Sequence, residues 1–311
     1  MYGDFAIFSG SSHPELAQSI CSHLGLPVGR SRSELADSGN LEVQILDNVR
    51  ESDVFVIQTA ATPLHQHIFE LFIMIDALKS ASAGRVTAVL PYMPYVRADK
   101  KSQPRISIVA RLLADLLVAS GADRVLTMDL HAPQVQGFFR VPTDQLQAAG
   151  ILCTHLQQHT DLSNAVVCAA DMGEAKDLGR YANRLDLPMA IIDRRGNDGH
   201  ERATNLIGEV DGKVAIIIDD EIDTGEKLVE ATEFLLSRGA AEVRAVATHG
   251  VFSGEAVQRI AESPVSGVTV TNTIPTPGGL PEKVHSLSVA KLFARAIQRI
   301  HDGNSVSALF R

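Results

Sequence analysis

The segment VAIIIDDEIDTGEKL, residues 214–228, combines two adjacent carboxylates with a Thr-Gly pair. Asp219 and Asp220 follow a run of apolar residues typical of a buried strand, and a helical pattern starts after Gly225. Backbone N–H groups at the start of a helix attract anions, and paired carboxylates can accept hydrogen bonds from sugar hydroxyls or hold a metal. The segment therefore predicts a cradle for a phosphorylated pentose. The alternative interpretation is that the D-x-x-D-T-G pattern only caps the helix.

A second segment, YVRADKKSQPR at residues 95–105, carries four cations within nine positions. It follows a strand expected at residues 86–90, and open α/β sheets bind ligands at the carboxyl ends of their parallel strands. Arginine offers forked hydrogen bonds to phosphate and lysine offers a mobile point charge, so these side chains suit the triphosphate of a nucleotide. The alternative is a solvated basic loop. The four cations are Arg97, Lys100, Lys101 and Arg105.

Two shorter segments place carboxylates directly after expected strands. In TMDLHA, residues 127–132, Asp129 and His131 could share a divalent metal or its bound water. In ADMGEAK, residues 170–176, Asp171 follows a strand, and a glycine two positions later permits close backbone approach. The alternatives are a structural histidine in the first segment and a plain strand-to-helix turn in the second.

The segment IDRRGNDGHERA, residues 192–203, adds two further cations after another expected strand. Arg194 and Arg195 stand at its start, and two glycines follow them. We interpret this segment as a mobile cationic flap, with an ordinary surface loop as the alternative.

Repeated βαβ units must position these segments, because short β-rich runs alternate with segments of helical periodicity along the chain. The expected strands cover residues 53–58, 86–90, 125–128, 165–168, 189–192, 214–218 and 243–248. The expected helices cover residues 64–80, 106–120, 175–185, 226–238 and 255–262. We expect an α/β fold with two domains, residues 1–147 and 148–311, and a last helix at 288–302 that can pack on the first domain.

Composition narrows the class of protein. The chain has 311 residues, of which 45% are hydrophobic and 21% charged, which is typical of a globular protein long enough for two domains. A net charge of −9 and 5% aromatic residues without tryptophan argue against a nucleic-acid partner. The sequence has neither a long apolar run nor the layout of a signal peptide, and its three cysteines form no close pair. We therefore expect a cytoplasmic protein without a membrane partner.

Six segments, taken in chain order, resemble the ribose-phosphate pyrophosphokinase (phosphoribosyl diphosphate synthetase) family along nearly the whole chain. They are FSGSSHPELA (8–17), VRESDVFVIQ (49–58), SASAGRVTAVLPYMPYVRADKK (80–101), GADRVLTMDLHAPQVQGFF (121–139), IIIDDEIDTG (216–225) and SVSALF (305–310). Several long matches in the same order are far more specific than any single motif.

The resemblance implies two tandem phosphoribosyltransferase-like (Rossmann-like) domains with mainly parallel sheets. It also implies an ATP-dependent diphosphotransferase that moves the β,γ-diphosphate of ATP to the C1 hydroxyl of ribose 5-phosphate, giving phosphoribosyl diphosphate and AMP. Mg²⁺ is the implied cofactor, and dimers that assemble into a hexamer are the implied oligomer.

The same resemblance assigns roles to individual residues. It implies that Arg194 and His131 are catalytic. It implies that ATP is bound by Asp37, Arg97, Asp99, Lys100 and His131. It places a metal on Asp129, His131 and Asp171. It assigns the ribose phosphate to Arg195, Asp219, Asp220, Asp223, Thr224, Gly225, Glu226 and Lys227.

Five positions depart from the family pattern. Leu35 replaces an aromatic residue near the adenine, Ala98 replaces a glutamine, and Arg194 takes the place of a lysine. Glu226 and Lys227 turn the usual D-T-G-G-T cradle into DTGEK, and we expect Lys227 to offset the carboxylate that Glu226 brings near the phosphate. These departures leave two alternatives open, an acceptor with a larger 5-substituent such as ADP-ribose, or a weakly active regulatory paralogue of the synthetase.

Overall fold

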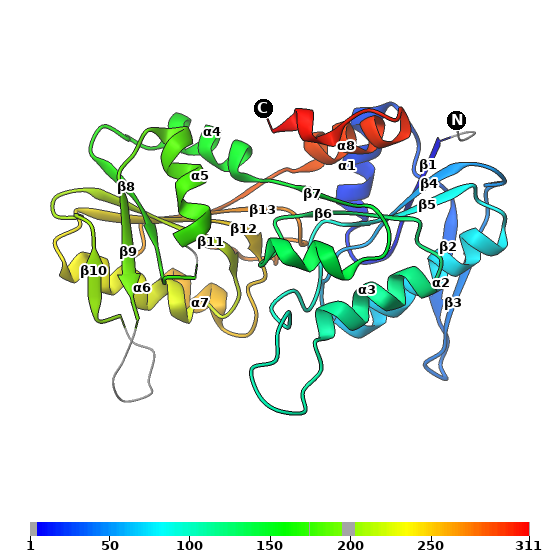
Figure 1. Cartoon of the computed structure of the whole chain (residues 1–311), viewed down its shortest axis with the longest axis horizontal. Helices are drawn as coiled ribbons and strands as arrows, with labels where there is room; N and C mark the ends of the chain where they lie inside the picture. The colour runs from blue at the N-terminus through cyan, green and yellow to red at the C-terminus, as the bar shows by residue number, and fades with distance from the viewer. Residues whose placement is uncertain (1–4, 174, 195–202, 311) are drawn as a thin grey trace. The chain divides into compact units, whose positions relative to one another are not determined.

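The computed structural model of the chain describes residues 5–173, 175–194 and 203–310. The chain forms two compact units, each built around its own sheet (Figure 1). Unit 1 comprises Met1–Gln147, Thr273–Pro275 and Ser288–Arg311, and unit 2 comprises Ala148–Asn272 and Thr276–Leu287. The chain therefore crosses between the units more than once, and the C-terminal helix belongs to unit 1.

The five-stranded sheet of unit 1 is entirely parallel, in the order β1-β4-β5-β6-β7. Its strands are β1 (Phe5–Ser9), β4 (Asp53–Ile57), β5 (Arg85–Leu90), β6 (Arg124–Met128) and β7 (Thr143–Leu146). β4 is buried at every position, as expected of a strand that helices cover on both faces. The parallel α/β class predicted from the sequence is confirmed here.

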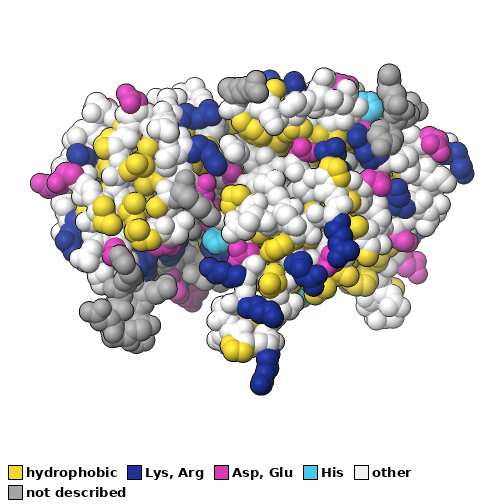
Figure 2. Space-filling view, viewed as in Figure 1, with side chains coloured by type: hydrophobic (Ala, Val, Ile, Leu, Met, Phe, Trp, Pro, Cys, Tyr) yellow, Lys and Arg dark blue, Asp and Glu magenta, His cyan; other side chains and the backbone are white. Residues whose placement is uncertain are grey.

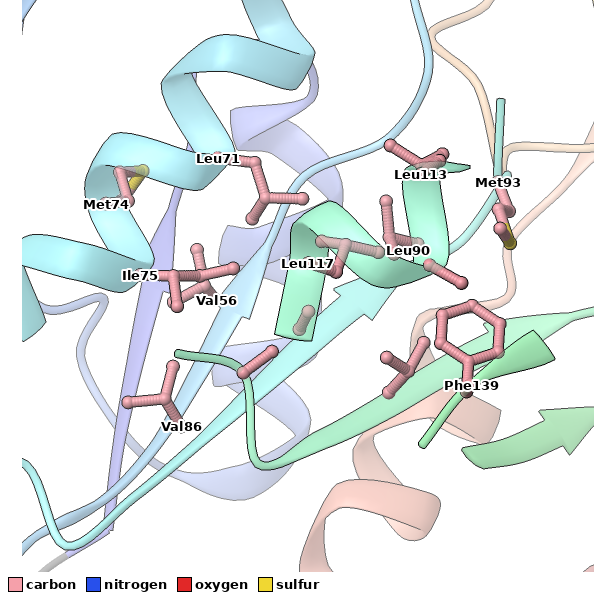
Figure 3. Close-up of a cluster of buried hydrophobic side chains, with 14 of the residues drawn as sticks. Val56, Leu71, Met74, Ile75, Val86, Leu90, Met93, Leu113, Leu117 and Phe139 are labelled. Carbon is pink, nitrogen blue, oxygen red and sulfur yellow. The ribbon is translucent and has the colours of Figure 1, made fainter. Parts of the chain in front are cut away.

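Helices cover both faces of this sheet (Figure 1). On one face lie α2 (Leu64–Ser80) and α3 (Val109–Ala119), whose apolar sides meet buried side chains of the strands (Figure 3). Leu71 and Ile75 of α2 pack with Val56 of β4, and each such buried side chain contributes roughly 1.5–3 kcal/mol. The other face carries α1 (Pro14–Leu24) and α8 (Ala290–His301), which contact each other.

A buried carboxylate ties the end of the chain to this sheet. Asp53, at the start of β4, is fully buried and accepts hydrogen bonds from Arg85 Nη2 at 2.5 Å and His301 Nδ1 at 2.9 Å. Arg85 Nη2 also donates to the carbonyl of Ile300 at 3.1 Å. Because buried charges need partners, this cluster fixes the end of α8 against β4 and β5.

A hairpin and short helical turns complete unit 1. The antiparallel strands β2 (Ser31–Leu35) and β3 (Leu41–Ile45) form a separate two-stranded sheet, and β3 contacts α2. Two 3₁₀ helices, η1 (Pro133–Phe138) and η2 (Val306–Leu309), follow β6 and α8.

The sheet of unit 2 has the order β10-β9-β8-β11-β12-β13-β14, and only the edge strand β10 runs antiparallel to its neighbour. Its strands are β8 (Ala165–Ala169), β9 (Met189–Asp193), β10 (Asn205–Ile207), β11 (Val214–Ile222), β12 (Glu242–Gly250), β13 (Gly267–Thr271) and β14 (Val284–Leu287). Helices α4 (Ala149–His159) and α5 (Ala175–Leu185) lie on one face, and α6 (Glu226–Ser237) and α7 (Ala256–Glu262) on the other (Figure 1).

The central strand β11 is longer than its sequence predicts. The apolar run predicts a strand that ends before Asp219, but β11 continues to Ile222. The neighbouring strand explains the difference, because Asp219 pairs with Ala247 and Ile222 with Gly250 in the parallel register. The pairing with β12 therefore includes Asp219 and resumes at Glu221, so the Asp-Asp pair lies within the strand.

Across the described residues, no helix is long and apolar enough to span a membrane. The three cysteines are buried and are not joined by a disulfide. Burial raises the pKa of the Cys21 thiol to about 11, that of Cys153 to about 11 and that of Cys168 to about 12.

We expect the native protein to react very slowly with a thiol reagent at neutral pH, because a buried thiol with a raised pKa supplies almost no thiolate. Titration with 5,5′-dithiobis(2-nitrobenzoic acid) should detect three thiols in denaturant and almost none without it. Rapid reaction of the folded protein would show that at least one cysteine becomes exposed in solution.

Candidate functional site

The turn between β11 and α6 has the backbone of an anion cradle. Gly225 occupies the N-cap position of α6 with φ +76°, a conformation that residues with a side chain adopt only with strain. Asp223 accepts a hydrogen bond from Ser253 Oγ, and Ser253 N donates to the Asp223 carbonyl at 3.1 Å. Asp223 thus anchors the turn to the segment after β12, a role different from the helix cap considered above.

Asp219 and Asp220 are held in fixed positions by the backbone that follows them. Asp219 Oδ1 accepts a hydrogen bond from Asp220 N at 2.9 Å, and Asp220 Oδ1 accepts one from Glu221 N at 3.0 Å. Only 12% of the Asp219 side chain is exposed. Each carboxylate therefore uses one oxygen to orient itself at the end of β11.

Lys227, on the first turn of α6, joins two of the predicted site residues. Its Nζ lies 2.7 Å from Asp171 Oδ2 and 3.2 Å from Asp219 Oδ2. Asp171 Oδ1 accepts the backbone N–H of Gly173 at 2.7 Å, which fixes this carboxylate in the loop after β8. The ammonium group therefore holds together the ends of two neighbouring strands, β8 and β11.

The charge partner of Glu226 is Arg259, whereas the sequence led us to expect Lys227. Its side chain is 71% exposed, and its Oε1 lies 3.4 Å from Arg259 Nη2. Arg259 also donates from Nη1 to the Thr224 carbonyl, so it braces the outside of the cradle. Adjacent helical residues point in different directions, which is why Glu226 and Lys227 find different partners.

Arg194 lies directly after β9 with its side chain only 13% exposed. Its guanidinium pairs with Glu230 of α6, and Glu230 Oε1 also accepts the backbone N–H of Ala203 at 3.1 Å. Among the described residues, the buried Nη1 of Arg194 has no hydrogen-bond partner. Glu230 thus fixes one edge of the Arg194 guanidinium, while the N–H groups of Nη1 keep no partner within the described structure.

In unit 1, the basic loop and the Asp-x-His segment follow neighbouring strands. β5 pairs with β6 so that Leu90 lies beside Thr127, which brings the ends of the two strands to one edge of the sheet. Lys and Arg side chains gather on the loop between β5 and α3 (Figures 1 and 2). Arg97 and Lys100 are exposed there, whereas Asp99, Asp129 and His131 are half-buried.

Comparisons with known proteins decide the family. A ribose-phosphate pyrophosphokinase of Deinococcus radiodurans is 51% identical over 98% of this chain and 97% of that protein. The chain belongs to the ribose-phosphate pyrophosphokinase family. A relative of the same name from Caldanaerobacter subterraneus is 46% identical over 98% of this chain and 97% of its own length.

Family models and a solved structure agree with this assignment. Residues 5–121 match the N-terminal domain of ribose phosphate pyrophosphokinase, and residues 200–311 match the phosphoribosyl synthetase-associated domain. The crystal structure of phosphoribosylpyrophosphate synthetase from Mycobacterium smegmatis superposes with a TM-score of 0.93 at 38% identity and covers 97% of this chain and 100% of that chain. The first match contains the basic loop and the second contains the cradle.

Not every residue that the ribose-phosphate pyrophosphokinase resemblance assigns is brought together. Asp37 is exposed in the turn of the β2–β3 hairpin, outside the five-stranded sheet. Asp129 and His131 belong to unit 1, whereas Asp171 belongs to unit 2. Arg195 lies outside the described residues. Within the described ranges, no group of three or more His, Cys, Asp or Glu side chains is arranged to hold a metal ion.

Three residues of the ribose-phosphate pyrophosphokinase cradle have no counterpart among the residues predicted from the sequence. Glu230, Ser253 and Arg259 orient Arg194, Asp223 and the Glu226 carboxylate, respectively. Ser253 lies shortly after the end of β12, and this position could have marked it as a candidate site residue in the sequence. Glu230 and Arg259 are charged residues on helices and carry no such signal.

Proposed function

We propose that this chain is a ribose-phosphate pyrophosphokinase that transfers the β,γ-diphosphate of ATP to the C1 hydroxyl of ribose 5-phosphate. The observation that carries the proposal is the cradle at residues 219–227, in a chain whose relatives named for this activity match 98% of its length. These matches do not favour a larger acceptor or a regulatory paralogue.

The reaction requires positioning more than covalent chemistry. The C1 oxygen of the sugar forms a bond to the β-phosphorus of ATP, and the bond from that phosphorus to the oxygen shared with the α-phosphorus breaks. AMP leaves with that oxygen, and the proton of the hydroxyl is released. Such a transfer is accelerated by in-line placement of the reactants and by cations that neutralise charge on the transferred group.

Unit 2 supplies the groups suited to the sugar. The N–H groups at the start of α6 attract the 5-phosphate, with Thr224 and Gly225 forming the turn. Asp219 and Asp220 accept hydrogen bonds from the ribose hydroxyls through oxygens that the backbone has already oriented. Arg194 donates to the transferred diphosphate from the nitrogen that Glu230 leaves available.

Unit 1 supplies the groups suited to ATP. Arg97 and Lys100 are exposed cations that can reach a triphosphate, and Asp99 lies beside them in the chain. We assign His131 to a phosphate oxygen or to a water on the metal, since an imidazole is a poor ligand for a hard cation. Asp37 contacts the adenine of a neighbouring subunit, which is why a homo-oligomer, with dimers that form a hexamer, is part of this proposal.

Mg²⁺ is the cation that best fits these groups. Asp129 offers carboxylate oxygens, whereas Asp171 can bind a metal only in exchange for its contacts with Lys227 Nζ and the Gly173 N–H. Mg²⁺ in nucleotide enzymes takes one or two carboxylates and completes its shell with phosphates and waters. Such a shell does not need three protein ligands in one cluster. When bound, Mg²⁺ would neutralise charge on the ATP phosphates. We place the enzyme in the cytoplasm, where ATP and sugar phosphates are available.

Incubation of the pure chain with ATP and Mg²⁺ tests the proposal. We expect AMP and phosphoribosyl diphosphate to form with ribose 5-phosphate, and much less AMP to form with ADP-ribose. AMP release that is equal without any sugar would indicate hydrolysis, and faster release with ADP-ribose would overturn the choice of acceptor.

Replacing Asp220 by Asn should raise KM for ribose 5-phosphate by about tenfold, because an amide keeps the shape but loses one charged acceptor. Steady-state rates of AMP release at varied ribose 5-phosphate measure this change. Asp186→Asn is a matched control, since Asp186 is exposed and Asn tolerates its positive φ. An unchanged KM and kcat in Asp220→Asn would remove this residue from the sugar site.

Replacing Glu226 by Gln should change KM for ribose 5-phosphate less than about threefold, because exposed ion pairs contribute little. The departure from the usual cradle would then be harmless to the 5-phosphate. Glu255→Gln is the matched control, because Glu255 is also exposed and lies 3.9 Å from Arg259. A tenfold fall in KM for Glu226→Gln alone would show that this carboxylate does repel the substrate.

A further inference from the structure

A cavity of about 390 Å³ lies between α4 and the strands β12, β13 and β14 of unit 2. It is lined by His155, Leu156, His159, Thr160, Arg244, Ala245, Gly267, Thr269 and His285. We call it the histidine cavity. None of its lining residues takes part in the cradle described above, and four of them can carry a positive charge.

The three imidazoles of the histidine cavity form one group. The His155 and His159 rings stack with centroids 4.3 Å apart, and the His155 and His285 centroids are 6.0 Å apart. His159 Nδ1 lies 3.0 Å from the His155 carbonyl. Since a carbonyl only accepts, Nδ1 carries the hydrogen, and protonation of His159 would add a second donor at Nε2.

Most donors around this group are unused. Within the described part of the chain, no hydrogen bond engages the ring nitrogens of His155 or His285, or the guanidinium of Arg244. Arg244 Nε lies 2.6 Å from Glu242 Oε1 in an ion pair without hydrogen-bond geometry. A Cβ at Gly267 would lie 3.4 Å from Arg244 Nη1, so the glycine keeps space beside the guanidinium.

The charges around the cavity favour an anion. Burial lowers the pKa of His155, and His159, His285 and Arg244 lower it further. Arg184 of α5 lies near the start of α4 and is not part of the lining of the cavity. Glu242 is the acidic group on β12, and it is paired with Arg244. A bound dianion would offset the repulsion among these positive groups, because its negative charge stabilises protonated imidazoles.

We propose that the histidine cavity binds a phosphate dianion, either free or carried by a small phosphomonoester, with Arg244, His155 and His285 as its donors. The cavity volume falls in the range of small-molecule sites and leaves room for a substituent on the phosphate. This site is separate from the proposed catalytic groups and does not depend on the proposed function.

Protonation and binding are linked in this proposal. The dianion stabilises protonated imidazoles, so binding takes up protons. This uptake is best measured at about pH 8, where phosphate is already a dianion. Isothermal titration calorimetry of the full chain with inorganic phosphate, and separately with glycerol 3-phosphate, measures the affinity at about pH 8. Repeating each titration in two buffers of different ionisation enthalpy measures the protons that are taken up. Tighter binding of one probe distinguishes free phosphate from a phosphomonoester as the source.

The double variant Arg244→Gln, His285→Gln should weaken this binding at least about tenfold, because hydrogen bonds to charged groups are the strong ones. The matched control is Arg140→Gln with His23→Gln, two exposed positions in unit 1. Phosphate bound at the cradle would remain as a second class in all proteins. Isotherms that are the same in the wild type and the double variant, or that show no proton uptake in the wild type, would overturn the proposal.

A measurement on the wild-type chain covers the case in which the double variant does not fold. Carbon-13 labelling of the eleven histidines allows each imidazole to be titrated by NMR with and without phosphate. We expect the pKa of His155 and His285 to rise when phosphate is added, with signals assigned from His155→Gln and His285→Gln. If phosphate moved neither signal, the histidine cavity would not be a phosphate site.

Discussion

Replacing Arg194 by Met should lower kcat for phosphoribosyl diphosphate formation by about 100-fold to 1000-fold while KM for ribose 5-phosphate changes little. Loss of one preorganised donor to developing charge typically costs a factor of this size. Arg194 is well placed to be such a donor, because Glu230 fixes its guanidinium and the buried Nη1 has no hydrogen-bond partner among the described residues. Initial rates of AMP release, with ATP and ribose 5-phosphate varied in turn, separate the two parameters.

Two further variants show whether Arg194 acts directly on the transferred group. Arg194→Lys keeps the charge and should retain kcat to within about tenfold, since an ammonium is also a strong donor to phosphate. Arg238→Met is the matched control, because Arg238 is an exposed arginine next to α6 that stacks on Phe234. If Arg194→Met fell no further than this control, Arg194 would only hold Glu230 and α6 in place.

Glu230 is the residue that positions Arg194. Glu230 accepts hydrogen bonds from both Arg194 and the backbone of Ala203, which are the described residues on either side of residues 195–202. One carboxylate on α6 thus joins both ends of the segment to the helix that begins at the cradle. The local sequence around Arg194 contains no sign of this partner, which lies 36 residues further along the chain.

The sequence predicted the central elements of both units well where their periodicity was strong. The helices at Leu64–Ser80 and Ala175–Leu185 have the predicted bounds, and the buried strands β4, β5 and β8 differ by one residue at one end. The β2–β3 hairpin was not predicted, because its strands SRSEL and LEVQI are mostly polar and largely exposed. β13, GVTVT, is rich in β-branched residues, a signal that the interpretation above did not use.

Side-chain partners in the cradle were harder to predict than its backbone. The turn at Gly225 and the start of α6 at Glu226 follow from local residue types. Lys227, however, contacts Asp171, which stands more than fifty positions earlier in the chain, because β8 and β11 are neighbours in the sheet. Strand order is a property of the whole fold, so spacing along the sequence does not contain this contact.

Lys227 contacts two carboxylates, and its ammonium neutralises their charge, which a bound metal ion would otherwise do. Lys227 replaces a threonine of the usual family cradle, and its Nζ lies between Asp171 and Asp219 at 2.7 and 3.2 Å. Without this ammonium, two partly buried carboxylates would face each other and the incoming phosphates. Their mutual repulsion would disturb Asp219, which is the residue proposed to hold the ribose hydroxyls.

Replacing Lys227 by Met should therefore lower kcat/KM for ribose 5-phosphate by about 10-fold to 100-fold, the range expected for loss of a charge-assisted contact to partly buried groups. Raising the concentration of Mg²⁺ should restore part of the activity, because the freed carboxylates attract a divalent cation. The decisive measurement is the rate of AMP release as a function of Mg²⁺ in the wild type and in Lys227→Met. Lys213→Met is the control, since Lys213 lies in the same unit and its Nζ donates only to the carbonyl of Glu209 in the described structure, at 3.3 Å. A loss of activity that Mg²⁺ cannot reduce, together with a lower unfolding temperature, would mean that Lys227 stabilises the fold of the cradle and does not substitute for a metal.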